Sequence, residues 1–238
     1  MKKLLTYCIL PLCIIVFAYL LISSINKPVK FNREKDAREK VAIERLKDIR
    51  TLQTTYKSAF NKYAPCMDTL IDFYNNGKIN IVKQIGSSDD SLAVAHTNAV
   101  KRRYGRKATE EFLYDLYLKG DNNLIIKIPV PIAVKDTLFH SRPNFNVEDL
   151  RYIPFADGDT IIMATAVKTV SGVEVPLFEA KIPYGWRPAP GEDFRGLLAG
   201  MNEQLIINLN AEREETNRYP GLMVGSIDSP NNNAGNWE

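Results

Sequence analysis

The densest group of like charges in the sequence lies in the segment KRRYGRK, residues 101–107. Five of these seven residues are basic: Lys101, Arg102, Arg103, Arg106 and Lys107. Ammonium and guanidinium groups can contact phosphates, anionic lipid headgroups or an acidic protein surface. The segment is therefore a candidate anion-contacting site. The alternative is a solvated loop between two helices, whose charge is offset by the nearby acids Glu110, Glu111 and Asp115.

The other chemically capable residues form no recognised catalytic or metal-binding pattern. The two histidines, His96 and His140, lie far apart and lack the spacing of zinc ligands. Serine-hydrolase, phosphate-loop and dinucleotide-binding motifs do not occur in the sequence. The net charge of +3 argues against a nucleic-acid-binding protein. We therefore expect no catalytic residues, no metal site and no cofactor, and a protein that is not an enzyme.

Two acidic groups have ordinary structural explanations. The segment DGD, residues 157–159, lies between two predicted strands and is typical of a turn. It lacks the alternating oxygen ligands of a calcium-binding loop. Glu110 and Glu111 follow Thr109 at the start of a predicted helix, where their charge complements the helix dipole.

The positions of the cysteines exclude an internal disulfide framework outside the apolar stretch at residues 4–25. Cys8 and Cys13 lie within that stretch, which leaves Cys66 as the single thiol beyond it. We predict that Cys66 is buried and inert, because free cysteine packs as a small hydrophobic residue. An intermolecular disulfide and a reactive thiol are the alternatives.

The N-terminal region contains a segment long enough to cross a membrane. Residues 4–25 carry no charge, and as a helix they extend about 33 Å, slightly more than a hydrocarbon core. The segment exceeds the apolar core of a cleaved signal peptide, which is the alternative, and no small-residue cleavage site follows it. We therefore predict a transmembrane signal-anchor at residues 1–26. Because long domains translocate largely regardless of charge, we expect the remainder outside a bacterial-type cytoplasmic membrane.

A long amphipathic helix is predicted over residues 27–63, since residues 29–64 contain neither glycine nor proline. Apolar or neutral residues recur along it in alternating steps of four and three, which is typical of a coiled-coil seam. These residues are Ala42, Leu46, Ile49, Gln53, Tyr56, Phe60 and Tyr63. We predict that the first four form a seam, within the helix at residues 34–63, that binds another protein chain in a homo- or hetero-oligomer. The aromatic end is expected to pack on the protein's own domain. The alternative is that the whole stripe packs on the protein's own sheet.

The rest of the chain is predicted to form an α+β domain over residues 64–230, followed by a polar tail at residues 231–238. Helices are expected at residues 68–75, 91–104 and 109–120, and a short polar helix at 211–216. Mostly antiparallel strands are expected at residues 124–128, 130–139, 152–155, 160–169, 173–182, 204–209 and 222–225, with a hairpin between 152–155 and 160–169. Pro129 and Pro131 argue for an edge strand.

Residues 37–74, AREKVAIERLKDIRTLQTTYKSAFNKYAPCMDTLIDFY, resemble the helical region of bacterial type IV pilins and type II secretion pseudopilins. In those families a membrane helix continues into an amphipathic helix, a short second helix and an antiparallel sheet. Residues 4–25 contain neither glycine nor glutamate, so the resemblance brings no prepilin cleavage site with it. The layout is also similar to the bitopic inner-membrane assembly proteins of the same machines.

The sequence therefore predicts a membrane-anchored structural or assembly protein, comparable to a scaffold component of a pilus or secretion system. Its partners would be the membrane and another protein chain. A membrane-tethered enzyme or small-ligand-binding protein, with a pocket in the loop-rich region around Trp186, is the alternative.

Overall fold

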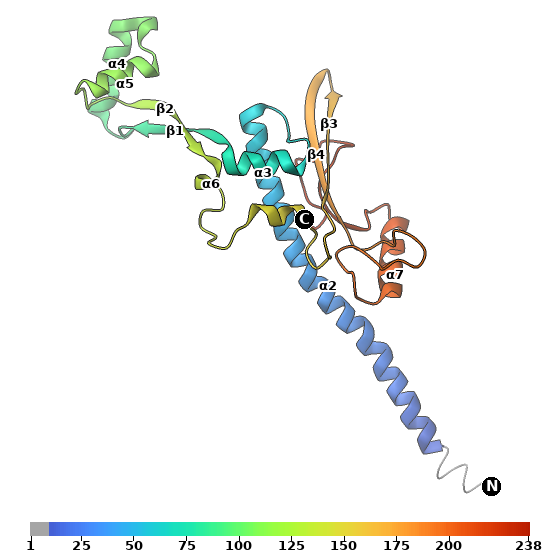
Figure 1. Cartoon of the computed structure of the whole chain (residues 1–238). Coiled ribbons are helices and arrows are strands. Elements are labelled where there is room, and N and C mark those ends of the chain that lie inside the picture. Colours follow the sequence, from blue (N-terminus) through green and yellow to red (C-terminus); the bar gives the residue numbers. More distant parts are fainter. Residues whose placement is uncertain (1–9) are drawn as a thin grey trace, which may run out of the picture. The chain divides into compact units, whose positions relative to one another are not determined.

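The computed structural model describes residues 10–238, which divide into two compact units (Figure 1). Unit 1 contains the chain up to Leu70 together with Asn146–Glu238, and unit 2 contains Ile71–Phe145. The fold class is α+β, as predicted: a long N-terminal helix, short helices, and antiparallel sheets of two and three strands. Residues 1–9 of the predicted anchor lie outside the described part of the chain.

Helix α2 runs from Leu10 to Phe60 and joins the predicted anchor to the predicted amphipathic helix in one element (Figure 1). Pro28 lies inside this helix, so the predicted boundary after residue 26 is not a break in it. Large apolar side chains in its first part, such as Phe17 and Leu21, are exposed. Among the described residues, α2 is the one helix long and apolar enough to cross a membrane.

The three-stranded sheet of unit 1 has the order β3-β4-β5. Strand β3 (Ile162–Val170) pairs antiparallel with β4 (Val173–Pro183), which pairs antiparallel with β5 (Gly221–Gly225). All three strands were predicted. The tight β3–β4 connection uses Ser171 and Gly172, both with positive φ. This backbone conformation suits the type of turn that joins two twisted strands.

The second part of α2 packs on this sheet and on the 3-10 helix η3 (Val147–Arg151). Leu46, Ile49 and Leu52 of α2 are fully buried, as are Phe178 and Ile182 of β4. The core of unit 1 therefore forms between one face of α2 and one face of the sheet.

The predicted partner-binding seam on α2 is wrong, because the chain's own domain covers it. Ala42, Leu46, Ile49 and Gln53 are each 0% exposed. The side-chain amide of Gln53 donates to the Ala64 carbonyl at 3.0 Å, and its oxygen accepts from the Ala64 N–H at 2.9 Å. Gln53, the one polar residue of the stripe, thus holds the segment that follows α2. The alternative, a stripe that packs on the protein's own sheet, is confirmed for these four residues and for the buried Tyr56 and Tyr63, whereas Phe60 is 50% exposed.

Basic side chains of α2 bind the acidic C-terminal part of unit 1. Residues 146–238 contain 14 Asp and Glu but 7 Lys and Arg. The Arg38 guanidinium donates to the carbonyl oxygens of Leu197 at 3.1 Å and Ala199 at 2.9 Å. The Arg45 guanidinium donates to the Tyr152 carbonyl at 2.5 Å. Charges on the sides of α2 therefore add directional contacts to the apolar packing.

Glu39 of α2 makes a further contact with Tyr184, the residue that follows β4. The hydroxyl of Tyr184, a fully buried residue, donates to the Glu39 carboxylate at 2.5 Å. Burial, followed by the hydrogen bond to Glu39, raises the pKa of Tyr184. The phenol therefore stays neutral and remains a donor to the carboxylate.

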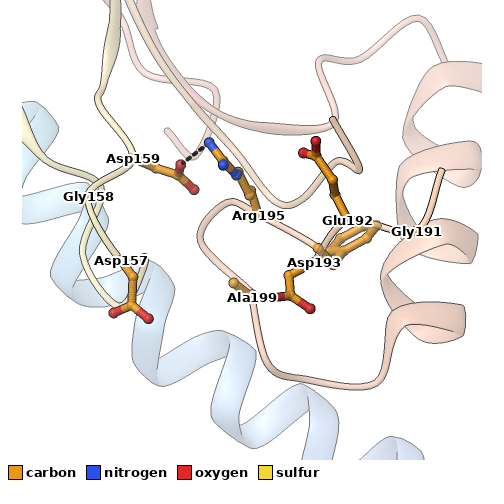
Figure 2. A pocket seen from close by; sticks show the side chains of 9 residues that line it. Asp157, Gly158, Asp159, Gly191, Glu192, Asp193, Arg195 and Ala199 are labelled. Carbon is orange, nitrogen blue, oxygen red and sulfur yellow. Dashed lines mark ion pairs between the residues drawn. The ribbon is translucent and has the colours of Figure 1, made fainter. Parts of the chain in front are cut away.

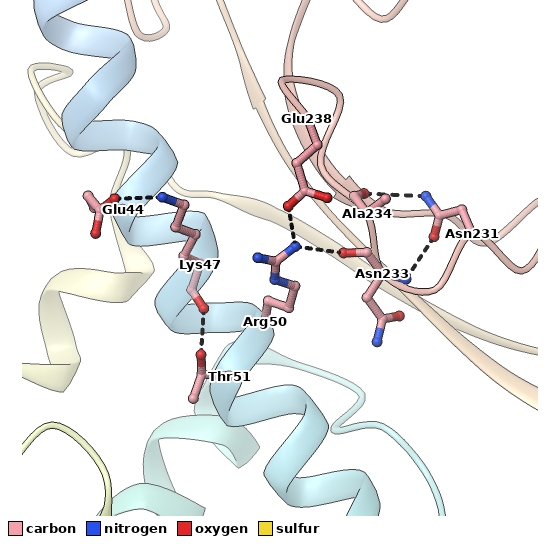
Figure 3. A network of polar contacts seen from close by, with 8 residues as sticks. All are labelled: Glu44, Lys47, Arg50, Thr51, Asn231, Asn233, Ala234 and Glu238. Atoms are coloured by element: carbon pink, nitrogen blue, oxygen red, sulfur yellow. Dashed lines mark hydrogen bonds and ion pairs between the residues drawn. The ribbon is translucent and has the colours of Figure 1, made fainter.

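The polar C-terminal tail is bound to α2 (Figure 3). The Arg50 guanidinium donates to the Glu238 carboxylate at 2.6 Å and to the Asn233 carbonyl at 3.3 Å. The Asn233 side chain donates to the Tyr63 hydroxyl at 2.9 Å. A bridge between Val224 and residue 235 attaches the tail to β5. The tail is therefore an integral part of unit 1.

Unit 2 is built on a two-stranded antiparallel ribbon that carries two helices. Strand β1 (Lys78–Ile85) pairs with β2 (Ile126–Ala133). Helices α4 (Ser91–Tyr104) and α5 (Glu110–Leu118), both predicted, share a small core with β2. Its fully or nearly buried members are Val100, Leu113, Leu124 and Ile126.

Pro129 and Pro131 of β2 are compatible with this ribbon. A proline lacks the backbone N–H group, but at these two positions that group would point away from β1. The N–H of Lys127 donates to the Glu110 side chain at 2.9 Å, away from β1. The direction of the N–H alternates along a strand, so Pro129 and Pro131 share the orientation of Lys127. Neither proline removes a hydrogen bond to β1, and both lie in an edge strand, as predicted.

Three strand assignments from the sequence need correction. Residues 204–209 are not a strand but the first part of α7 (Glu203–Glu215), where the Asn202 side chain caps the Leu205 N–H at 3.1 Å. The predicted short helix at residues 211–216 is the end of the same helix.

The predicted strand at residues 152–155 is also wrong, because only an isolated bridge between Tyr152 and Thr160 forms there. The ribbon strand β1 was not predicted, although Ile79, Ile81 and Ile85 recur at every second or fourth position, and most of its side chains are exposed.

Two shorter helices border these elements. Helix α3 (Met67–Asn76) confirms the helix predicted at residues 68–75. The predicted extended segment 130–139 is wrong beyond Ala133, because helix α6 (Val134–Thr137) follows β2 and buries Val134.

The prediction that Cys66 is buried is also wrong. Cys66 precedes α3 and is exposed. Its sulfur lies 3.2 Å from the Thr69 hydroxyl, and this hydrogen bond lowers the pKa of the thiol. The residue makes no disulfide within the described chain.

The buried face of α2 predicts a specific loss of stability. Leu46→Ala should lower the free energy of unfolding by about 2–5 kcal/mol, since it removes a fully buried side chain. Denaturant unfolding of the full chain in detergent, followed by circular dichroism, measures this. Val41→Ala is the matched control, because Val41 lies on the same helix with 44% exposure, and its effect should stay within about 0.5 kcal/mol. Equal effects of the two changes would contradict the assignment of Leu46 to the core.

The Arg50 contact predicts pH-dependent attachment of the tail. Arg50 lowers the pKa of Glu238, so this contact stabilises the attached tail above the usual glutamate pKa, and the stabilisation is lost as pH falls through the lowered value. Arg50→Gln should loosen the end of the tail at pH 7, while the contacts of residues 233–236 with Tyr63 and β5 remain. Trp237 fluorescence in a Trp186→Phe background, with amide hydrogen exchange of the tail, measures this loosening. Lys40→Gln, which removes an exposed charge of the same helix, should leave the tail unchanged. An unchanged tail in Arg50→Gln would refute this role of Arg50.

Candidate functional sites

The predicted anion-contacting residues lie at the end of α4 and in the 3-10 helix η2 (Gly105–Lys107). Asp90 caps the start of α4, and Gly105, with φ of +55°, ends it. The basic residues at the end of α4 and those of η2 therefore lie on consecutive helical turns. Four of them are exposed and form no ion pair among the described residues: Arg102, Arg103, Arg106 and Lys107. We refer to these four residues as the basic patch.

Lys101 differs from the other predicted contacts because it is already paired. Its ammonium group donates to the Glu110 carboxylate at 3.0 Å, and the same carboxylate accepts the Lys127 N–H. Burial opposes ionisation of Glu110, but the contacts from Lys127 and Lys101 outweigh it and lower the pKa of the carboxyl. For Lys101 the alternative interpretation is therefore correct, because a nearby acid, Glu110, offsets its charge. Unit 2 as a whole contains 11 Lys and Arg and 8 Asp and Glu, so its excess of three positive charges equals that of the whole chain.

An acidic hollow of about 530 Å³ lies in unit 1 (Figure 2). Its carboxylates come from two loops: Asp157 and Asp159 from one, Glu192 and Asp193 from the other. Asp159 is nearly buried and accepts the N–H of residue 196 at 3.0 Å. The other three acids are exposed. The segment 157–159 is a turn, as predicted, and within residues 10–238 no group of side chains has the arrangement of a metal site.

A second cavity, of about 510 Å³, lies in the region that the sequence singled out around Trp186. Trp186 and Phe194 provide aromatic walls, and Ile207 and Asn210 of α7 line the other side. The Asn210 side chain donates to the Gly185 carbonyl at 2.8 Å, whereas its Oδ1 atom is buried and has no hydrogen-bond partner among the described residues. A Cβ atom on Gly185 would lie 2.1 Å from the Phe194 ring, so this wall requires glycine.

The histidines do not come together. His96 pairs with Asp121 at 2.8 Å on the surface of unit 2. His140 lies 3.1 Å from the carbonyl oxygen of Thr137. In the part of the chain that the structure describes, no hydroxyl or thiol side chain hydrogen-bonds to either imidazole, so neither histidine forms a nucleophile–base pair there.

Comparison with protein-family models, with curated proteins and with solved structures finds no match for this chain. The fold and the possible sites are therefore interpreted from the residues themselves.

Sequence reasoning located the basic patch and the Trp186 region but missed the acidic hollow. The two loops of the hollow are separated by more than thirty residues, and each alone looks like an ordinary turn. The acidic runs at residues 157–159 and 192–193 were its local signals, but nothing in the sequence joins the two.

Proposed function

We propose that the protein is a membrane-anchored structural or assembly protein that acts through protein–protein contacts, without a catalytic step. One observation carries the proposal: α2 is a single helix of 51 residues whose first part is apolar and exposed and whose second part is the core of unit 1. Anchor and domain core are thus one rigid element. A protein that holds partners at a membrane needs such a mechanical connection, whereas a tethered enzyme can use a flexible linker.

The resemblance to pilins, pseudopilins and their bitopic assembly proteins is part of this proposal. In it, α2 acts as a signal-anchor in a bacterial-type cytoplasmic membrane, and the domain at residues 64–230 lies outside the cytoplasm. The packing of an antiparallel sheet on the second part of α2 supports this layout. The cleavage motif of pilins has no counterpart in residues 4–25, so the helix would remain in the membrane rather than leave it.

The partner surface must lie elsewhere than the stripe on α2, which is buried. The four residues of the basic patch are exposed and form no ion pair among the described residues, so the patch fits an acidic protein surface. Tyr104, within the same segment, is 39% exposed and packs against Phe112 with tilted rings whose centroids are 4.8 Å apart. An exposed aromatic ring among arginines is typical of the residues that dominate binding energy at interfaces.

Photo-crosslinking in native membranes tests this proposal. A benzophenone amino acid in place of Tyr104 should give one protein adduct of defined mass. The adduct should be lost when Arg102→Glu and Arg103→Glu are added, since reversal of both charges repels an acidic partner. Substitution at Tyr152, which has similar exposure in unit 1, is the control and should not give that adduct. The absence of an adduct at Tyr104, or an adduct that survives both charge reversals with the protein folded and present, would overturn the basic patch as the partner surface.

The Trp186 cavity favours a second candidate function, the binding of a small molecule. Its volume lies within the range of about 300–1,000 Å³ of small-molecule sites, and its aromatic walls surround a buried, unpaired amide oxygen. Native mass spectrometry of the purified full chain should then show a copurified small molecule. Trp186→Ala should lower its occupancy at least about tenfold, because the largest wall of the cavity is removed. Trp237→Ala, which changes the tail, should leave it bound. No bound mass, or equal occupancy in both variants, would exclude this function.

A further inference from the structure

A third cavity, of about 550 Å³, lies within unit 1 between α2 and the start of α7. The α2 wall is formed by Leu20, Ser24, Lys27 and Pro28. The facing wall includes Gln204 and Leu205 of the first turn of α7. The cavity was not foreseen from the sequence, because its walls are separated by about 180 residues.

The position of this cavity along α2 matches the edge of the apolar segment. Leu20 and Ser24 belong to the uncharged residues 4–25, and Lys27 is the first charged residue after them. At a rise of 1.5 Å per residue, Ser24 and Lys27 are about 4.5 Å apart along the helix axis. If α2 crosses a membrane, the cavity therefore spans the boundary between the acyl chains and the headgroups.

The chemistry of the walls changes across that boundary. Leu20, Pro28 and Leu205 present apolar surface, whereas Lys27 is exposed and has no ion pair among the described residues. The acidic residue nearest the facing wall, Glu203, is paired with Arg187. The cavity thus combines an apolar interior with one uncompensated cation at the level of the headgroups, which suits a ligand with an acyl chain and an anionic head.

We propose that this cavity binds one anionic phospholipid, with an acyl chain against Leu20, Pro28 and Leu205 and the phosphate at Lys27. The inference rests on the proposed function in one respect, the insertion of α2 into a membrane. The bound lipid covers apolar surface of Leu20 and Pro28 that is otherwise exposed, and it connects the start of α7 to the bilayer. The domain is then held directly against the membrane surface rather than at the end of a free rod.

A lipid photolabelling experiment tests this proposal. The full chain is reconstituted in nanodiscs of phosphatidylcholine that contain phosphatidylglycerol with a diazirine in its acyl chain, then irradiated and digested. The peptide with residues 202–205 should carry the lipid. Lys27→Glu should lower this labelling at least about fivefold, since the charge at the phosphate is reversed. Lys30→Glu is the matched control, because Lys30 is an exposed lysine of the same helix outside the cavity wall, and it should leave the labelling unchanged.

The outcomes separate this proposal from the membrane anchoring on which it depends. Labelling of α2 residues 10–25 without labelling of residues 202–205 would overturn the lipid site and leave the anchor intact. No labelling of either peptide would overturn the anchor itself. Equal labelling of residues 202–205 in Lys27→Glu and Lys30→Glu, or equal labelling by a diazirine phosphatidylcholine, would overturn the assignment of an anionic headgroup to Lys27.

Discussion

The burial of one face of α2 is the constraint on which unit 1 depends. Leu46, Ile49 and Leu52 supply the helical side of the core, and the sheet cannot bury its own inner face without them. The apolar face of this sheet is buried against the helix, so the helix and the sheet stabilise each other. Because the same helix carries the apolar segment that is long enough to cross a membrane, that segment and the helical side of the unit 1 core belong to one element.

Electrostatics reinforce this packing. The chain up to Leu70 has 13 basic and 6 acidic residues, whereas residues 146–238 have 7 basic and 14 acidic ones. The two segments therefore attract each other before any specific contact forms. Arg38, Arg45 and Arg50 turn this attraction into hydrogen bonds to carbonyl groups and, for Arg50, to a carboxylate. Three arginines of α2 therefore serve inside unit 1, whereas Lys27, Lys30, Arg33 and Lys40 of the same helix are exposed.

The sequence was sufficient for the elements whose signals are local. The glycine- and proline-free part of α2, the β3–β4 hairpin and the Thr109 cap could all be predicted from adjacent residues. The partner of the α2 stripe could not, because a heptad pattern identifies a buried face but not the chain that buries it. Strand β1 was missed although four of its eight residues are isoleucine or valine, and most of its side chains are exposed because a two-stranded ribbon buries little on either side. The cavities escaped prediction because their walls join distant segments, and only the fold brings those together.

The close packing of unit 1 on α2 changes the interpretation of the helix. A rod that extends into solvent would display its apolar stripe to a partner and keep the domain far from the bilayer. Instead Phe31, six residues beyond the apolar segment, is already 9% exposed, and the contacts with residues 197–205 lie beside residues 20–38. If residues 10–25 lie in a membrane, the sheet domain begins at its surface. Partners that bind the part of unit 1 beside residues 20–38 must then approach the headgroups, where acidic lipids and the cations of α2 also influence association.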